Sequence, residues 1–315
     1  MSAVPVTAKK DTGADTAQAV GTRWWTPYAL LSPGMLWLVV FFAVPTITLV
    51  STSLQSGTLE SGFSFTFEFG NYVDAVSGSW DVYLKSLVYS LLATLSCLAI
   101  AYPLAYTMAF KAGRWKNIML VLVIAPFFTS FLLRTNAWKT ILSDNGFVVT
   151  WMHNLGILDV LHAIQIPVIF ADGISGADRV LQTPLGVIAG LTYNFLPFMT
   201  LPLYASLERI DVRLIEAGQD LYATPWTAFR KVTFPLSLPG VVAGTLLTFI
   251  PAAGDPVNAS LLGGPRDAMV GNKIYNTFYR LFDYPLAAAL SVILMAMIVT
   301  LVTLYVRRAG TEELV

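Results

Sequence analysis

The stretch DVRLIEAGQDLYATPWTAFRKVTFPLSLPG, residues 211–240, is the longest polar interruption late in a chain that is otherwise mostly apolar. Its first half places apolar or small side chains at helical spacings of three and four, with polar side chains on the opposite face. The first set is Ile210, Leu214, Ala217, Gly218 and Leu221, and the second is Arg213, Glu216, Gln219 and Asp220. These spacings predict a short amphipathic helix.

A second helix is predicted to begin at Pro225. Thr224 has a side chain suited to an N-cap, and proline suits the first helical position because its missing N–H has no helical partner there. Trp226, Phe229 and Val232 then share one face. We expect a helix–turn–helix across a membrane surface. A simple connector needs only a few residues, so this size indicates a surface for a soluble partner, and an interfacial helix pair without a partner is the alternative.

The composition indicates a polytopic membrane protein. Hydrophobic residues make up 56% of the 315 residues and charged residues only 12%. This length has room for about six spans of roughly twenty residues each. The formal net charge is zero, so we expect no nucleic-acid partner. The single cysteine, Cys97, lies in an apolar run and is expected to be a packed thiol.

Six apolar segments are predicted to cross the lipid bilayer, which gives an all-α fold. They are Tyr28 to Leu54, Ser86 to Phe110, Ile118 to Leu133, Gly186 to Tyr204, Ser237 to Asn258 and Leu286 to Val306. The chain thus divides into a tail (residues 1–27), a six-span domain (28–306) and a second tail (307–315). The first apolar run is longer than the core of a signal peptide, so we expect an uncleaved span.

The distribution of lysine and arginine predicts the orientation. Twelve of these residues fall in the two tails, the short turn near Arg114, and the polar segment 211–240 together with Arg209 just before it, whereas seven are spread over the longer loops of the other side. Positive charge accumulates on the cytoplasmic side of membrane proteins. Both termini and residues 211–240 are therefore predicted to be cytoplasmic.

Two outer loops are predicted, Gln55 to Lys85 and Arg134 to Pro184. The second contains apolar patches, but none is long enough to span, so we expect a membrane-lying surface for an extracytoplasmic partner. Its histidines, His153 and His162, have no acidic or cysteine companion at metal-ligand spacing. The sequence therefore predicts no metal site.

Catalytic motifs are absent from the sequence. No G-x-x-x-x-G-K-[ST] phosphate loop, G-x-S-x-G or H-E-x-x-H motif occurs. We therefore expect that the chain is not an enzyme, and that any ATP hydrolysis linked to it takes place in another chain.

The spans offer a few polar side chains as candidates for a substrate path. Asp255 lies sixteen residues beyond Pro239, roughly 24 Å along a helix at 1.5 Å per residue, within a bilayer core about 30 Å thick. An intramembrane carboxylate suits a cationic cargo. The alternative is an aspartate at the edge of a loop bent by its glycine and proline neighbours. Further candidates are Asn258, Tyr193 and Asn194.

The polar segment resembles the EAA loop of binding-protein-dependent ABC transporter permeases. Glu216, Ala217 and Pro235 match the family pattern, whereas Gly218, Tyr222, Val232 and Phe234 replace its Ala, Gly, Ile and Leu at the same spacing. The resemblance implies that this segment, including Asp220 and Pro225, couples the spans to an ATPase subunit. Tyr222 implies a changed turn between the two helices, because tyrosine resists backbone conformations that glycine allows.

Three further stretches resemble the polyamine-importer branch of these permeases: LLRTNAW (132–138), YNFLPFMTLPLYASLERID (193–211) and LLGGP (261–265) followed by GNKI at Gly271. The resemblance covers about residues 28 to 306. It implies a six-span type I importer permease of the MetI-like fold in the bacterial inner membrane, with spermidine or putrescine as cargo.

The same resemblance implies the partners. They are a second, homologous permease subunit, a cytoplasmic ATPase dimer that binds ATP and magnesium, and an extracytoplasmic solute-binding protein, with no cofactor in this chain. Iron, thiamine or organic anions remain alternative cargoes, because their importers share much of these stretches. An ion-coupled carrier or a membrane scaffold is the alternative of another class, although the sequence has no inverted repeat and few paired intramembrane charges.

Overall fold

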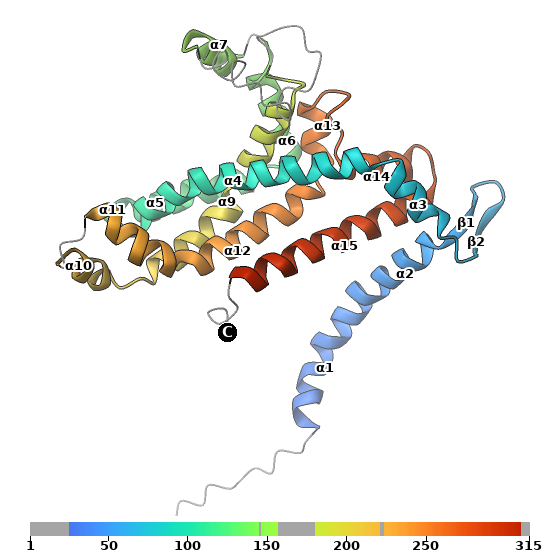
Figure 1. Cartoon of the computed structure of the whole chain (residues 1–315), viewed down its shortest axis with the longest axis horizontal. Coiled ribbons are helices and arrows are strands. Elements are labelled where there is room, and N and C mark those ends of the chain that lie inside the picture. Colours follow the sequence, from blue (N-terminus) through green and yellow to red (C-terminus); the bar gives the residue numbers. More distant parts are fainter. Residues whose placement is uncertain (1–24, 145, 157–179, 221–223, 310–315) are drawn as a thin grey trace, which may run out of the picture. The chain divides into compact units, whose positions relative to one another are not determined.

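The computed structural model describes residues 25–144, 146–156, 180–220 and 224–309 (Figure 1). Most of the predicted tail 1–27, the end of the predicted tail 307–315, and His162 lie outside these ranges. The chain forms two compact units, residues 1–48 and 49–315. Within the described ranges, five helices are long and apolar enough to cross a membrane, and a bent helix pair gives up to six spans. The predicted all-α membrane fold is confirmed.

The first unit contains the first predicted span. α1 (Thr26–Leu38), the π-helical turn η1 (Val39–Ala43) and the start of α2 (Val44–Ser53) form one continuous apolar helix. Pro45 lies just after the π turn. A proline has no N–H and its ring collides with the carbonyl four residues earlier, and a wider turn relieves both problems without ending the helix.

The first predicted outer loop is structured. β1 (Gln55–Thr58) and β2 (Gly62–Phe65) pair as an antiparallel hairpin, and α3 (Gly70–Ser77) follows. The Asn71 side chain donates to the Ser53 and Gln55 carbonyl oxygens at 3.0 and 2.9 Å, which fastens α3 to the end of α2. The loop is also shorter than predicted, because the next helix begins at Trp80 and not at Ser86.

Three helices form the core of the second unit and run side by side in Figure 1: α4 (Trp80–Phe110), α9 (Pro184–Glu208) and α12 (Phe234–Ala253). Small side chains let these helices approach closely. Cys97 of α4 is fully buried, as expected, and its thiol donates to the Thr192 carbonyl oxygen of α9. At Gly240 of α12, an added Cβ would lie 2.5 Å from the Ser206 Cβ of α9.

The third predicted span is bent. η2 (Gly113–Trp115), α5 (Lys116–Ile124) and η3 (Ala125–Phe128) form its first part, and α6 (Phe131–Ile141) then leaves at 98°. The prediction of a single span from Ile118 to Leu133 is wrong beyond Phe128. The cause is local: Pro126 lies in the tight 3₁₀ turn, and Thr129 has an extended backbone that ends the helix.

The fifth predicted span starts earlier and ends sooner than expected. α11 (Pro225–Ala228) and the π turn η4 (Phe229–Thr233) continue directly into α12, giving one helix from Pro225 to Ala253. The prediction of a separate second surface helix is therefore wrong. The predicted end at Asn258 is wrong too, because that residue belongs to the short helix α13 (Val257–Leu262).

The described part of the chain also contains α7 (Phe147–Asn154), α14 (Val270–Tyr279) and α15 (Tyr284–Ala309). α15 is the sixth predicted span, slightly longer at both ends. α14 is held by Asn272, whose side chain donates to the Pro256 carbonyl oxygen and to the Ser260 hydroxyl, both at 2.6 Å.

Candidate functional site

The predicted amphipathic helix of the polar segment is α10 (Val212–Asp220). The Asp211 carboxylate accepts from the Arg213 N–H at 3.0 Å and starts the helix. Glu216 and Ala217 are exposed. Gly218 faces the next element, because a Cβ added there would meet the Val232 side chain at 3.6 Å. One side of α10 thus packs on η4, and its Glu-Ala pair stays free for a partner.

The turn after α10 contains Tyr222, which lies outside the described residues, and the side chain of Asp220 is likewise not described. The structure resumes at Thr224, whose hydroxyl accepts from the Thr227 N–H at 3.3 Å, so Thr224 is the predicted cap. Pro225 takes the first helical position. The start of α11 is therefore built as the sequence predicted.

An aromatic contact links this cap to the core. Trp226 is 69% exposed and stacks on Phe229, with ring centroids 5.4 Å apart. Phe229 also contacts the rings of Tyr102 and Tyr106 of α4 at 5.5 and 6.2 Å. The start of this helix is therefore connected to two core helices. Chain continuity connects it to α12, and the packing of Phe229 connects it to α4.

Pro235 is the second residue of α12 and lies two residues after the end of the π turn η4. This is the arrangement seen at Pro45, where a π turn also ends two residues before the proline. The wider turn lets the helix pass the proline without a break. The family-like Pro235 thus sets the shape of the joint between α11 and α12.

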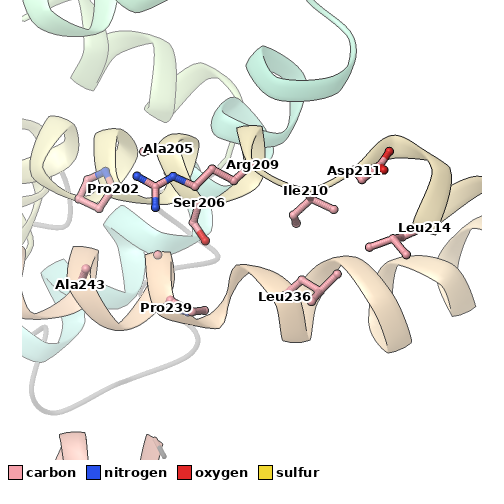
Figure 2. A pocket seen from close by; sticks show the side chains of 11 residues that line it. Pro202, Ala205, Ser206, Arg209, Ile210, Asp211, Leu214, Leu236, Pro239 and Ala243 are labelled. Atoms are coloured by element: carbon pink, nitrogen blue, oxygen red, sulfur yellow. The ribbon is translucent and has the colours of Figure 1, made fainter. Parts of the chain in front are cut away.

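An open groove of about 580 Å³ lies between α9, α10 and α12. Figure 2 shows Pro202 and Pro239 on the two facing helices, and Arg209 extending back along α9 while Asp211 points away from it. Mostly small or apolar side chains line the rest. The groove therefore separates part of α10 from α9 and α12.

Three of the four substrate-path candidates meet in one buried polar chain. The Asn194 amide of α9 donates to the Thr135 hydroxyl of α6 at 3.1 Å and to the Asn258 side-chain oxygen of α13 at 3.0 Å. The Asn258 amide in turn donates to the Asp255 carboxylate. All four side chains are at least 94% buried. Tyr193 does not join them, and packs on Trp138 with ring centroids 5.2 Å apart.

Asp255 lies just beyond α12 and starts α13. Its carboxylate accepts from the Val257 N–H at 2.7 Å and from the Asn258 N–H at 3.3 Å, in addition to the Asn258 amide. A carboxylate with three donors is stable in a buried position. Among the described residues, the arrangement joins α6, α9 and α13 through hydrogen bonds and leaves Asn194 Oδ1 without a partner.

Sequence reasoning missed Thr135 and Asn272 as members of buried polar contacts. Nothing in the spacing of the sequence links Thr135 to Asn194, which is 59 positions away. Within the part of the chain that the structure describes, no group of three or more histidine, cysteine or acidic side chains is arranged to hold a metal ion.

The family follows from a direct comparison. Residues 75–309 match the family described as binding-protein-dependent transport system inner membrane component. The chain belongs to this family. The predicted resemblance to this permease family is thus confirmed over residues 75–309. Members of this family are inner-membrane components by description, which agrees with the apolar helices found here.

Among relatives in this family, the spermidine/putrescine transport system permease protein PotB of Salmonella typhimurium (strain SL1344) is 35% identical over 272 residues. The match covers 86% of this chain and 89% of the relative. The resemblance to the polyamine branch is therefore confirmed.

Solved structures agree on the fold. A chain of a bacterial ABC transporter for the import of the acidic polysaccharide alginate has a TM-score of 0.62 at 17% identity, covering 92% of this chain and 96% of that one. A chain of the bacterial alginate ABC transporter in complex with an alginate pentasaccharide-bound periplasmic protein has a TM-score of 0.61 at 18% identity, covering 91% and 96%. At these identities the likeness concerns the fold alone.

Proposed function

We propose that this chain is a permease subunit of an ATP-driven, binding-protein-dependent importer of polyamines. The observation that carries the proposal is the 35% identity to a spermidine/putrescine permease over 86% of the chain. In this role the chain forms half of a translocation path and hydrolyses no ATP itself. A second permease subunit supplies the other half.

The coupling surface of this proposal is the exposed face of α10 together with α11. Glu216 and Ala217 of α10 are exposed, and so is the Trp226 side chain of α11. A cytoplasmic ATPase dimer, which binds ATP and magnesium, takes this surface. Movement then passes along α12, since α11 and α12 form one helix, and through Phe229 to α4. Both termini lie on the same cytoplasmic side.

An extracytoplasmic solute-binding protein delivers the cargo at the opposite end of α12. The buried polar chain from Thr135 to Asp255 lies at that end and contributes to the path or to its outer closure. One buried carboxylate near a path lowers the cost of passing a positive charge through an apolar surrounding. High affinity then belongs to the binding protein, because a deep well in the permease would trap the cargo.

Uptake by cells tests this proposal. A strain that lacks this chain is complemented with the wild-type gene, and initial uptake of labelled spermidine and putrescine is compared with that of iron, thiamine and an organic anion. Polyamine uptake that requires both this chain and a co-purifying ATPase is expected. Restoration of another cargo alone contradicts the polyamine assignment, and gradient-driven uptake by the lone chain contradicts the importer class.

A further inference from the structure

The bend between η3 and α6 holds a positive charge against aromatic rings. The guanidinium carbon of Arg134 lies 5.3 Å from the ring centroid of Phe127 and 5.8 Å from that of Phe131. Phe198 of α9 meets Phe127 edge to face, with centroids 5.1 Å apart. Cations within about 6 Å of a ring face are attracted by the ring. In this chain the cation beside these rings is the guanidinium of Arg134.

The guanidinium is incompletely satisfied in this position. Arg134 Nε and Nη1 are buried and have no hydrogen-bond acceptor among the described residues. No carboxylate in the same part of the chain forms an ion pair with Arg134. Leaving buried donors of a charged group without acceptors is unfavourable. The rings attract the guanidinium of Arg134. Its N–H groups without an acceptor, in contrast, favour a position in which water or another acceptor can bind them.

The rings are accessible from outside the chain. Phe127 and Phe198 are each 37% exposed. The helix is already interrupted between Phe128 and Phe131, so the Arg134 side chain is attached to a bend and not to the interior of a straight span. Interrupted helices at membrane depth are typical of positions that line a cavity or path.

We propose that Phe127 and Phe131 bind an ammonium group of the cargo, and that Arg134 is a tethered cation that occupies this site until the cargo replaces it. The proposal rests on the proposed function as a polyamine permease. An exchange of one cation for another leaves the net charge of the site unchanged. It avoids the cost of adding a charge to a low-dielectric region, which a vacant site would incur.

Cargo binding to the assembled transporter tests the exchange. The complex of both permeases and the ATPase is placed in lipid nanodiscs without the solute-binding protein, and the Kd of labelled spermidine is measured. Arg134→Gln is expected to lower the Kd several-fold, because a site that the guanidinium occupies offers cargo only the remaining fraction. In the Arg134→Gln background, Phe127→Leu is expected to raise the Kd about fivefold, the size of a cation–π contact of ~1 kcal/mol. In wild type the rise should be smaller, because the same substitution also weakens the hold on the competing guanidinium.

Matched variants separate the exchange from general effects. Lys139→Gln removes the same charge from α6, and Phe128→Leu removes a neighbouring ring that is 88% exposed. Both are expected to bind like wild type. Arg134→Lys keeps a tethered cation and should also stay near wild type. In the Phe127→Leu background, Arg134→Gln should tighten binding less than it does in wild type, since the guanidinium then competes less strongly for the site.

Two results overturn the inference. One is an Arg134→Gln Kd that equals that of Lys139→Gln in a complex that elutes as a single species. The other is that Arg134→Gln lowers the Kd by the same factor in wild type and in the Phe127→Leu background. If wild-type cells take up spermidine but these variants show either result, only the tethered-cation inference fails. If wild type neither binds nor transports polyamines, the proposed function fails with it.

Discussion

A buried carboxylate such as that of Asp255 needs donors around it, because charge in an apolar surrounding is costly. Two backbone N–H groups and the Asn258 amide supply them. Asn258 also accepts from Asn194, so its amide must point its nitrogen toward Asp255 and its oxygen toward Asn194. Each side chain in this row fixes the orientation of the next.

Exchanging the acid Asp255 and the amide Asn258 tests this buried polar chain. Asn258→Asp places a second carboxylate against the first in a buried site, and like charges disfavour each other's ionised form. We expect a larger loss of thermal stability than for Asp255→Asn, which removes one acceptor and costs about 1 kcal/mol. The double variant Asp255→Asn/Asn258→Asp, with one carboxylate, should recover part of the loss. Melting temperatures in detergent measure all three, and an Asn258→Asp variant as stable as wild type contradicts the assigned orientation.

Asp267 gives a prediction for the pH dependence of stability. Its carboxylate, in the loop between α13 and α14, accepts from the Gly264 N–H at 2.8 Å and from the Tyr89 hydroxyl at 3.2 Å. Burial raises the pKa of the Asp267 carboxyl, although these two hydrogen bonds and the charge of Lys85 oppose the shift.

An acid whose pKa is raised on folding stabilises the folded state below its unfolded pKa, and this contribution is lost as the pH rises through the folded pKa. The melting temperature of wild type should therefore fall more between acidic and neutral pH than that of Asp267→Asn. Asp283→Asn, at a partly buried carboxyl that caps α15, serves as the control. Parallel curves for wild type and Asp267→Asn contradict the expected sign.

At the scale of elements, a π turn precedes Pro45 and another precedes Pro235, and in both places the span remains continuous. Sequence reasoning predicted a separate surface helix before the fifth span, beginning at Pro225 after the Thr224 cap. A proline removes one hydrogen bond and collides with one carbonyl. Whether the chain then breaks, as near Pro126, or widens, as before Pro235, depends on the packing of the flanking residues. The packing of the flanking residues belongs to the tertiary structure, so it cannot be derived from the spacing of residues in the sequence.

Other parts were accessible from the sequence because they depend on neighbours in the chain. The cap at Thr224, the amphipathic helix after Asp211 and the number of apolar spans follow from local rules. The path candidates Asn194, Asn258 and Asp255 were found because polar side chains are rare in apolar segments. The contact of Asn194 with Thr135 could not be found, since it depends on the bend that brings α6 against α9.

Close helix packing provides an element-scale prediction. A Cβ at Gly240 would lie 2.9 Å from the Pro202 carbonyl oxygen and 2.5 Å from the Ser206 Cβ, so α9 and α12 must separate to accept it. Overpacking of this kind costs about 1–3 kcal/mol. We expect Gly240→Ala to lower the melting temperature and the uptake rate together. At Gly254 the nearest atom to an added Cβ is the flexible Leu294 Cδ2 at 3.8 Å, so Gly254→Ala should be tolerated.

The coupling assignment of α10 gives a second element-scale prediction. Glu216→Ala removes an exposed carboxylate from a helix that crosses no membrane, so insertion and melting temperature should be unchanged. Polyamine uptake and cargo-stimulated ATP hydrolysis should fall at least tenfold if Glu216 contacts the ATPase. Glu60→Ala makes the same change at the exposed turn of the hairpin and should have no effect. Normal uptake by Glu216→Ala removes the support for this coupling surface.

At the scale of the whole second unit, α12 connects two regions of different chemistry. Its helix begins at Pro225 beside the exposed surface of α10 and ends at Ala253 beside the buried polar chain of Asp255. At 1.5 Å per residue, the 29 residues of this helix extend about 43 Å, more than the hydrocarbon core of a bilayer. A continuous helix transmits a displacement over this length more directly than jointed segments. The proposed coupling therefore depends on the continuity of α12.

Breaking α12 in its middle should separate ATPase recruitment from transport. Leu247 is 51% exposed, so Leu247→Pro removes a helical hydrogen bond and kinks the helix with little loss of buried side chain. The surface of α10 and α11 remains, and we expect the ATPase to co-purify in wild-type amount while polyamine uptake is lost. Leu247→Ala shortens the same side chain without breaking the helix and should retain uptake. If Leu247→Pro transports normally, α12 is not the transmitting element, and the contact of Phe229 with α4 becomes the route to test, because it is the second connection from α11 to the core.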